Sequence, residues 1–333
     1  MTEERRVEWE EVPDPLLRDA NDAIVRPLAV ALCDLDQPML RGEAPFPGPI
    51  ALGHEFVAEV VQSGDMNEVG AGTVAVVPFQ ISCGECARCL RGQTGDCLTV
   101  PERSMFGFGS FGGNWGGALS DYVRVPFADH MLVPIPEGVS PVAVASASDN
   151  IPDAWRTVYE PLRRRPRADV LIVGGGSPSI GLYAIEVARA LGAGSVTYTD
   201  HNGDRLGIAE RLGAEVHEGE LPRRLGPFPV TVDCGASRES LALALRSTEP
   251  DGECTSTGII FEPETPVPLL EMYTSGIHFH TGRAQARPHI PAILELVAEG
   301  RLHPELVTSN VVPFDDAAEA VQVRERKLVI ERE

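Results

Sequence analysis

The sequence predicts an α/β protein in which a β-rich, loop-rich first half is followed by a doubly wound parallel sheet. Short β-type runs separated by turns fill residues 1–149, whereas apolar strands alternate with helical segments over residues 150–282. The chain has 333 residues, 43% of them hydrophobic. This length favours two domains, since single cores stop growing near about 250–300 residues.

Apolar, β-branched runs define the strands of the first half, and turn-forming residues separate them. One run ends at Cys33, and another follows Gly53-His54-Glu55. A glycine-rich stretch over residues 107–117 predicts a loop. The strands predicted here are residues 23–32, 56–61, 73–79, 119–125 and 131–135.

The second half opens with a strand, a glycine-rich turn and a helix. Residues 169–173 form a short apolar run, and apolar side chains then recur at helical spacing over residues 180–191. Glycines let the backbone approach a pyrophosphate, and the helix N-terminus offers unpaired N–H groups to it. The residues expected to bind a dinucleotide in this turn are Gly174, Gly176, Ser177 and Gly181.

Asp200 follows the next predicted strand, residues 195–199, at nineteen positions after Gly181. An acid about twenty residues beyond the turn accepts hydrogen bonds from a cofactor ribose and repels a 2′-phosphate, which favours NAD over NADP. The alternative is a solvated turn residue, and the nearby Arg205 is suited to a phosphate. Further strands are predicted at residues 230–233, 254–260, 311–312 and 328–330, with a helix at residues 290–297.

Four of the seven cysteines stand in one glycine-flanked run, and their spacing predicts a structural zinc site. Four thiolates surround Zn²⁺ tetrahedrally and leave no position open for a substrate. The alternative is a set of free or disulfide-bonded cysteines. The predicted ligands are Cys83, Cys86, Cys89 and Cys97.

A second set of candidate metal ligands is dispersed along the chain. Cys33 and His54 each lie at the end of a β-type run, and Asp36 and Glu55 stand close to them in sequence. Asp149 is either a third ligand or the N-cap of the following helix. Three protein ligands with one open position are typical of a catalytic zinc.

Composition excludes several classes of function. The net charge is −21 and the pI is near 4.8, so the surface repels nucleic acid and anionic lipid. The sequence has no run of eighteen apolar residues and no signal-peptide core, and a cytoplasmic location is expected. Lys327 is the only lysine, so chemistry that needs a central lysine has almost no candidate.

These motifs together resemble the zinc-dependent medium-chain dehydrogenases of the alcohol dehydrogenase superfamily. The matching features are Cys33-x-x-Asp36, Gly53-His54-Glu55, the four-cysteine run, Gly116-Gly117 before Tyr122, Asp149 and the glycine turn. The resemblance implies a GroES-like catalytic domain over residues 1–149, to which residues 283–333 return. It also implies a Rossmann domain over residues 150–282 and a homodimer or homotetramer.

By the same resemblance, Cys33, His54 and Asp149 bind a catalytic zinc, Asp36 is hydrogen-bonded to His54, and Glu55 approaches the metal. The implied reaction transfers hydride between NAD(H) and a small alcohol or carbonyl compound. Phe79 matches a position that lines the substrate pocket, and Trp115 and Trp155 are further candidates for an apolar pocket.

Departures from the family pattern keep alternative functions open. Leu35 stands where a Ser or Thr usually relays the alcohol proton, and four residues separate Gly176 from Gly181 where the usual motif has two. The alternatives are reduction of an activated double bond, oxidation of a polyol or an aldehyde hydrate, and a non-catalytic zinc scaffold.

Overall fold

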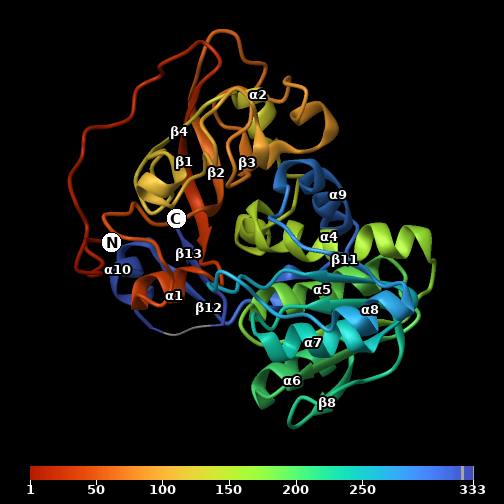
Figure 1. Cartoon of the computed structure of the whole chain (residues 1–333). Helices are drawn as coiled ribbons and strands as arrows, with labels where there is room; N and C mark the ends of the chain where they lie inside the picture. The colour runs from red at the N-terminus through yellow and green to blue at the C-terminus, as the bar shows by residue number, and fades with distance from the viewer. Residues whose placement is uncertain (324–325, 333) are drawn as a thin grey trace. The chain divides into compact units, whose positions relative to one another are not determined.

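The computed structural model describes residues 1–323 and 326–332, and the chain divides into two compact units. Unit 1 comprises Met1–Pro152 and Ala284–Glu333, and unit 2 comprises Asp153–Arg283. In Figure 1 the red trace that precedes the first strand carries no helix or strand. Among the described residues, no helix is both long and apolar enough to cross a membrane.

Unit 1 is built on a sheet of seven strands within the described residues. Six of them follow the order β12-β13-β1-β2-β3-β5, and β4 pairs with β1. The antiparallel register of β1 and β2 sets Ala31 opposite Glu55, so the end of one strand lies beside the start of the other. The strands are β1 (Ala23–Ala31), β2 (Glu55–Ser63), β3 (Val74–Val77), β4 (Val123–Val125), β5 (Val133–Pro134), β12 (Asn310–Pro313) and β13 (Leu328–Glu331).

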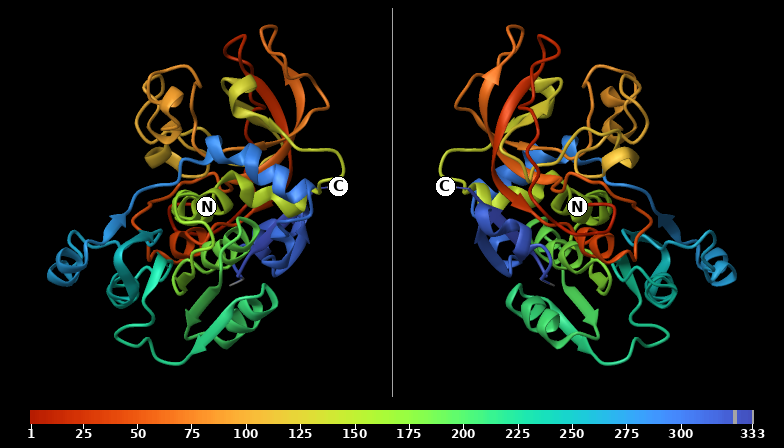
Figure 2. Two further views of the ribbon diagram at one scale, coloured as in Figure 1. Left: turned by 90° about the vertical axis from the view of Figure 1, so that its right-hand side faces the viewer. Right: turned by 90° about the vertical axis from the view of Figure 1, so that its left-hand side faces the viewer.

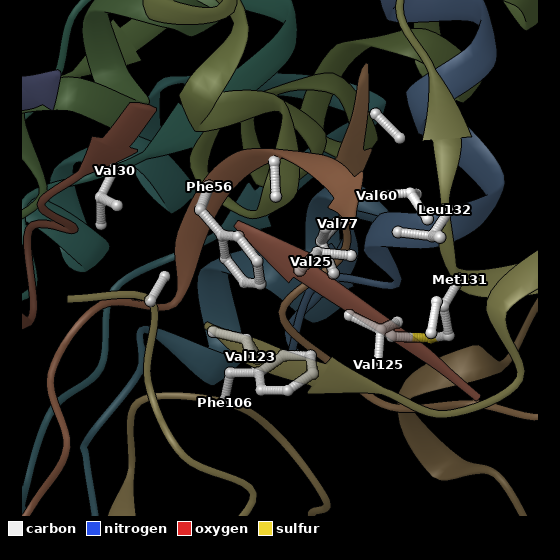
Figure 3. Packing of buried hydrophobic residues seen from close by; sticks show 14 of the residues in the cluster. Val25, Val30, Phe56, Val60, Val77, Phe106, Val123, Val125, Met131 and Leu132 are labelled. Carbon is white, nitrogen blue, oxygen red and sulfur yellow. The ribbon is translucent and has the colours of Figure 1, made fainter. Parts of the chain in front are cut away.

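Alternating apolar side chains from these strands form the core of unit 1. Figure 3 shows Val25, Val77 and Val123 in this cluster, with the rings of Phe56 and Phe106 close together. The two rings meet edge to face, with their centroids 5.5 Å apart, a favoured aromatic geometry. The strands that lead into the candidate ligand segments, β1 and β2, are therefore packed on this apolar core.

Short helices and 3₁₀ turns connect the strands of unit 1. The strands predicted over residues 119–125 and 131–135 are only partly correct, because residues 119–122 are not a strand and Met131 ends a helix. The helices are α1 (Asp36–Arg41), α2 (Ala128–Met131), α3 (Pro141–Val144), α9 (Ala286–Ala298) and α10 (Ala317–Ala320); the 3₁₀ turns are η1 (Cys89–Arg91), η2 (Thr94–Asp96), η3 (Gly109–Gly112), η4 (Ala145–Ser148), η5 (Pro304–Leu306) and η6 (Phe314–Asp316).

Unit 2 contains a parallel sheet, and Figure 2 shows strands and helices alternating along its green-to-cyan part. Over the described residues the order is β11-β10-β9-β6-β7-β8, which is the order of a Rossmann fold. The strands are β6 (Val170–Val173), β7 (Val196–Asp200), β8 (Glu215–Glu218), β9 (Phe228–Asp233), β10 (Thr248–Ser256) and β11 (His278–His280); the helices are α5 (Pro178–Ala190), α6 (Gly203–Arg211), α7 (Arg238–Ser247), α8 (Leu269–Ser275) and α4 (Asn150–Arg164), which begins in unit 1.

Candidate metal centres and cofactor site

Three segments of unit 1 bring Cys33, His54 and Asp149 together. Cys33 follows β1, and His54 directly precedes β2, so the pairing of these strands sets the two side chains close to each other. Asp149 ends the turn η4. Ser148 fastens this turn to β2, because its hydroxyl accepts a hydrogen bond from Phe56 N and donates one to Phe56 O, each at 2.9 Å.

The ligand atoms of this group converge on one point. Asp149 Oδ2 lies 3.5 Å from Cys33 Sγ and 3.5 Å from His54 Nε2. One atom each from Cys33, His54, Glu55 and Asp149 lie within 4.8 Å of one another. Thiolate, imidazole and carboxylate are the ligand types that zinc prefers.

The environment of these atoms favours a cation. Both ring nitrogens of His54, Asp36 Oδ1 and Glu55 Oε1 are buried without a hydrogen-bond partner. Burial alone lowers the pKa of His54, but the carboxylates of Asp36 and Asp149 raise it to about 9. Burial and the neighbouring acids raise the pKa of Cys33 well above its ordinary value. A divalent cation would reverse this effect by stabilising the thiolate, so the residues present fit a zinc ion.

The structure places Asp36 and Glu55 in different roles. Asp36 Oδ2 accepts a hydrogen bond from Cys33 N at 2.8 Å. Asp36 Oδ1 lies 3.6 Å from His54 Nδ1, which is beyond hydrogen-bonding distance, so the expected hydrogen bond to His54 is not present. Burial raises the pKa of Glu55 to about 7, although the Lys327 ammonium acts in the opposite direction.

Aromatic side chains surround the imidazole of His54. The ring centroid of the predicted pocket residue Phe79 lies 5.9 Å from the centroid of the imidazole, and the ring centroid of Phe108 lies 4.8 Å from it. Phe79 and Phe108 belong to one apolar cluster, and Leu35 packs against it. The other candidates have different surroundings, since the Trp115 ring packs under the Arg124 guanidinium and Trp155 stacks on Tyr159 in unit 2.

The second candidate metal centre is the four-cysteine run, whose sulfur atoms also lie within 4.8 Å of one another. The turns η1 and η2 fold the run back on itself, and Gly92 ends η1 in the left-handed region at φ 78°. All four cysteines are free thiols in the structure. Backbone N–H groups of Cys89 and Leu98 lower the pKa of Cys86 to about 6, whereas burial and the neighbouring Cys86 and Cys97 raise the pKa of Cys89 to about 12.

The glycine turn of unit 2 joins β6 to α5. Gly174 is packed so closely that an added Cβ would lie 2.2 Å from Tyr198 Oη and 2.5 Å from Asp200 Oδ2. Pro178 occupies the first turn of α5, where proline is favoured because its missing N–H would have no partner there. Ser177 precedes it as the N-cap, and its side chain forms no capping hydrogen bond.

Asp200 ends β7 and is buried in a dense hydrogen-bond network. Arg205 contacts both of its oxygens, with Nε 2.7 Å from Oδ2 and Nη2 2.6 Å from Oδ1. Tyr198 donates to Oδ2 at 2.8 Å, and Asn202 N donates to Oδ1 at 3.0 Å. Burial by itself raises the pKa of Asp200, but the bonds and charge of Arg205 hold it below its ordinary value.

Sequence reasoning did not identify Phe108, Asn150 or Lys327 as neighbours of the ligand group. Asn150 Nδ2 donates to Cys33 Sγ at 3.2 Å, and Lys327 Nζ donates to Glu55 Oε2 at 2.7 Å. The available signal for Lys327 was a single lysine at the head of the apolar run 328–330. An ammonium group next to a buried strand is itself buried, and a buried charge is costly unless acceptors or an opposite charge pair with it.

Two family models match the chain. Residues 19–137 match the "Alcohol dehydrogenase GroES-like domain", and residues 179–299 match "Zinc-binding dehydrogenase". The chain is 30% identical over 319 residues to a protein of Mycobacterium tuberculosis named "Probable zinc-binding alcohol dehydrogenase", covering 92% of this chain and 79% of that protein.

Other similar proteins agree with this family. A glutathione-independent formaldehyde dehydrogenase of Pseudomonas aeruginosa is 34% identical over 297 residues, covering 85% of this chain and 67% of that protein. The alcohol dehydrogenase TADH from Thermus sp. ATN1 superposes with a TM-score of 0.87 at 30% identity, over 100% of this chain and 99% of that one. The chain thus belongs to the zinc-binding medium-chain dehydrogenases of the alcohol dehydrogenase superfamily, with a GroES-like domain and a Rossmann domain.

Proposed function

We propose that the protein is a zinc-dependent oxidoreductase that transfers hydride between NAD(H) and a small alcohol or carbonyl compound. The observation that carries this proposal is the convergence of Cys33, His54 and Asp149, with buried ring nitrogens that lack partners. The four-cysteine centre holds a second, structural zinc. Asp200 supports NAD, because its carboxylate suits ribose hydroxyls better than a 2′-phosphate.

The chain's own residues would organise this reaction. A bound zinc ion would polarise the substrate oxygen, and a bound nicotinamide would serve as the hydride acceptor or donor. Cys33, His54 and Asp149 hold the metal. Phe79 and Phe108 flank the imidazole, so they exclude water from that side of the centre and favour a small apolar substrate.

Metal and cofactor binding test this proposal before any substrate is known. We expect two zinc ions per purified wild-type chain and a saturable fluorescence change on titration with NADH. The substitution Asp149→Ala should leave one zinc per chain, because the four cysteines lie in a separate centre. One zinc in the wild type and no NADH binding would indicate the non-catalytic scaffold.

A second candidate function is oxidation of an aldehyde hydrate to a carboxylic acid. Leu35 does not separate the two functions, because an alcohol and an aldehyde hydrate each lose one hydroxyl proton as the hydride leaves and this side chain relays neither. The 34% identity to a protein named as a formaldehyde dehydrogenase favours the aldehyde hydrate.

A panel of primary and secondary alcohols, polyols and short aldehydes, assayed with NAD⁺ at neutral pH, separates the two functions. Faster turnover of aldehydes than of alcohols would favour the second. If the missing hydroxyl limits proton release, Leu35→Thr should raise kcat for alcohols and for aldehyde hydrates, because both substrates lose a hydroxyl proton. An unchanged or lower alcohol rate would contradict this account of Leu35.

A further inference from the structure

The single lysine of the sequence lies at the centre of unit 1. Lys327 precedes β13 and its side chain is fully buried. Its ammonium group donates to Leu32 O at 2.7 Å, to Glu55 Oε2 at 2.7 Å and to Asn150 Oδ1 at 2.8 Å. An ammonium group has three N–H donors, and these three contacts use them all.

Each partner of Lys327 is the sequence neighbour of a candidate zinc ligand. Leu32 precedes Cys33, Glu55 follows His54, and Asn150 follows Asp149. The pairing of β13 with β1, which sets Val329 opposite Ala31, brings Lys327 to this position. One side chain therefore ties together the three segments that carry the ligands.

Asn150 extends this connection to the ligand atoms themselves. Because Lys327 only donates hydrogen bonds, it requires the carbonyl oxygen of the Asn150 amide on its own side. The amide nitrogen then faces the ligands, where it donates to Cys33 Sγ at 3.2 Å and to Asp149 Oδ2 at 3.3 Å. Lys327 thus sets which end of the amide meets the sulfur.

Lys327 also balances charge beside a group of buried acids. Cys33, Asp36 and Glu55 are buried around it, and a buried charge is costly unless it is paired and hydrogen-bonded. The contact with Lys327 engages Oε2 of Glu55, so this carboxylate is tethered at one oxygen. The other oxygen, Oε1, has no hydrogen-bond partner, so Lys327 fixes the position from which this free oxygen faces the ligand group.

We propose that Lys327 is a positioning residue of the three-ligand metal centre, acting through Asn150 and Glu55. This inference rests on the proposed zinc at Cys33, His54 and Asp149. Lys327 touches neither substrate nor metal. It holds the ligand-bearing segments and the donor to the cysteine sulfur in place.

Release of zinc from the full chain tests the proposal without an activity assay. Wild type and Lys327→Met, each loaded with two zinc ions, are mixed with excess chelating dye, and release is followed by absorbance. We expect Lys327→Met to release one zinc at least about tenfold faster, whereas release from the four-cysteine centre keeps its wild-type rate. In the cobalt-substituted proteins, Lys327→Met should also shift the band that arises from the bound thiolate.

Control variants separate positioning from a general loss of stability. Arg26→Met breaks the Arg26–Glu59 ion pair between β1 and β2 and should leave both release rates unchanged. Asn150→Ala keeps the Lys327–Glu55 pair, so it tests the connection from Lys327 through Asn150 to Cys33 even if Lys327→Met does not fold. It should accelerate release of the zinc ion bound by Cys33, His54 and Asp149.

Three outcomes are decisive. Wild-type release rates in both Lys327→Met and Asn150→Ala would overturn the inference. So would equal acceleration at the two centres, since that is the behaviour of a merely structural lysine. A wild-type protein that binds only one zinc would instead overturn the proposed function itself.

Discussion

At the scale of single residues, Asp200 already has a full set of partners before any cofactor binds. A carboxylate offers about four acceptor positions, and Arg205, Tyr198 and Asn202 together supply four hydrogen bonds to it. If Asp200 binds the cofactor ribose, the ribose hydroxyls displace at least one of these donors. Arg205 is the partner with a long, flexible side chain, and its positive charge offsets the repulsion that Asp200 exerts on a 2′-phosphate.

Arg205→Ala should therefore sharpen the preference for NADH over NADPH. We expect the Kd for NADPH to rise at least about tenfold while the Kd for NADH stays the same or falls, because the freed carboxylate repels phosphate and accepts hydroxyls. Fluorescence titration of both cofactors measures the ratio. Arg211→Ala is the control. Arg211 lies on the same helix, but its guanidinium donates a hydrogen bond to Gly207 O and not to Asp200. An unchanged ratio in Arg205→Ala would show that Arg205 takes no part in discrimination.

At the scale of elements, the apolar pattern predicted the central strands and missed the two end strands of the parallel sheet. β1, β2 and β6 are rich in buried apolar residues, which is the signal that sequence reasoning uses. β8 and β11 lie at the two ends of the parallel sheet and carry mostly polar, half-exposed side chains. They were not predicted because an edge strand need not be apolar.

The candidate site shows a similar limit. Cys33, His54 and Asp149 were proposed through family resemblance, because their distance in sequence says nothing about their distance in space. Lys327 was missed since a lone lysine is normally solvated. Only the folded chain brings acceptors from three segments onto its ammonium group.

The link between β6 and α5 provides a prediction at this scale. Gly174→Ala should destabilise the protein by about 1–3 kcal/mol, the usual cost of overpacking, because the new Cβ meets the buried Tyr198 and Asp200 side chains. Urea unfolding measures the change, and NADH binding should weaken with it. Gly203→Ala, at the start of α6 with no atom within 4 Å of an added Cβ, should change stability by less than about 0.5 kcal/mol. Equal stability of the two variants would refute the close packing inferred for Gly174.

At the scale of the whole molecule, each unit has its own sheet and its own core. Both candidate metal centres lie in unit 1, whereas the glycine turn and Asp200 lie in unit 2. A ligand stabilises the folded form to which it binds, by about 2.7 kcal/mol at a concentration of 100 Kd. The two kinds of ligand are therefore expected to act on different parts of the chain.

Hydrogen exchange followed by mass spectrometry tests this division. Removing zinc with a chelator should raise exchange in peptides from β1, β2 and the four-cysteine run, because ligand sulfurs and carboxylates lose the ion that holds them together. Exchange in β6, β7 and β9 should stay at its original level. NADH added to the metal-free protein should slow exchange in β6, α5 and β7. Chelation that raised exchange equally in β6 and β9 would show that the two units unfold as one, and the metal centres would then stabilise the whole chain.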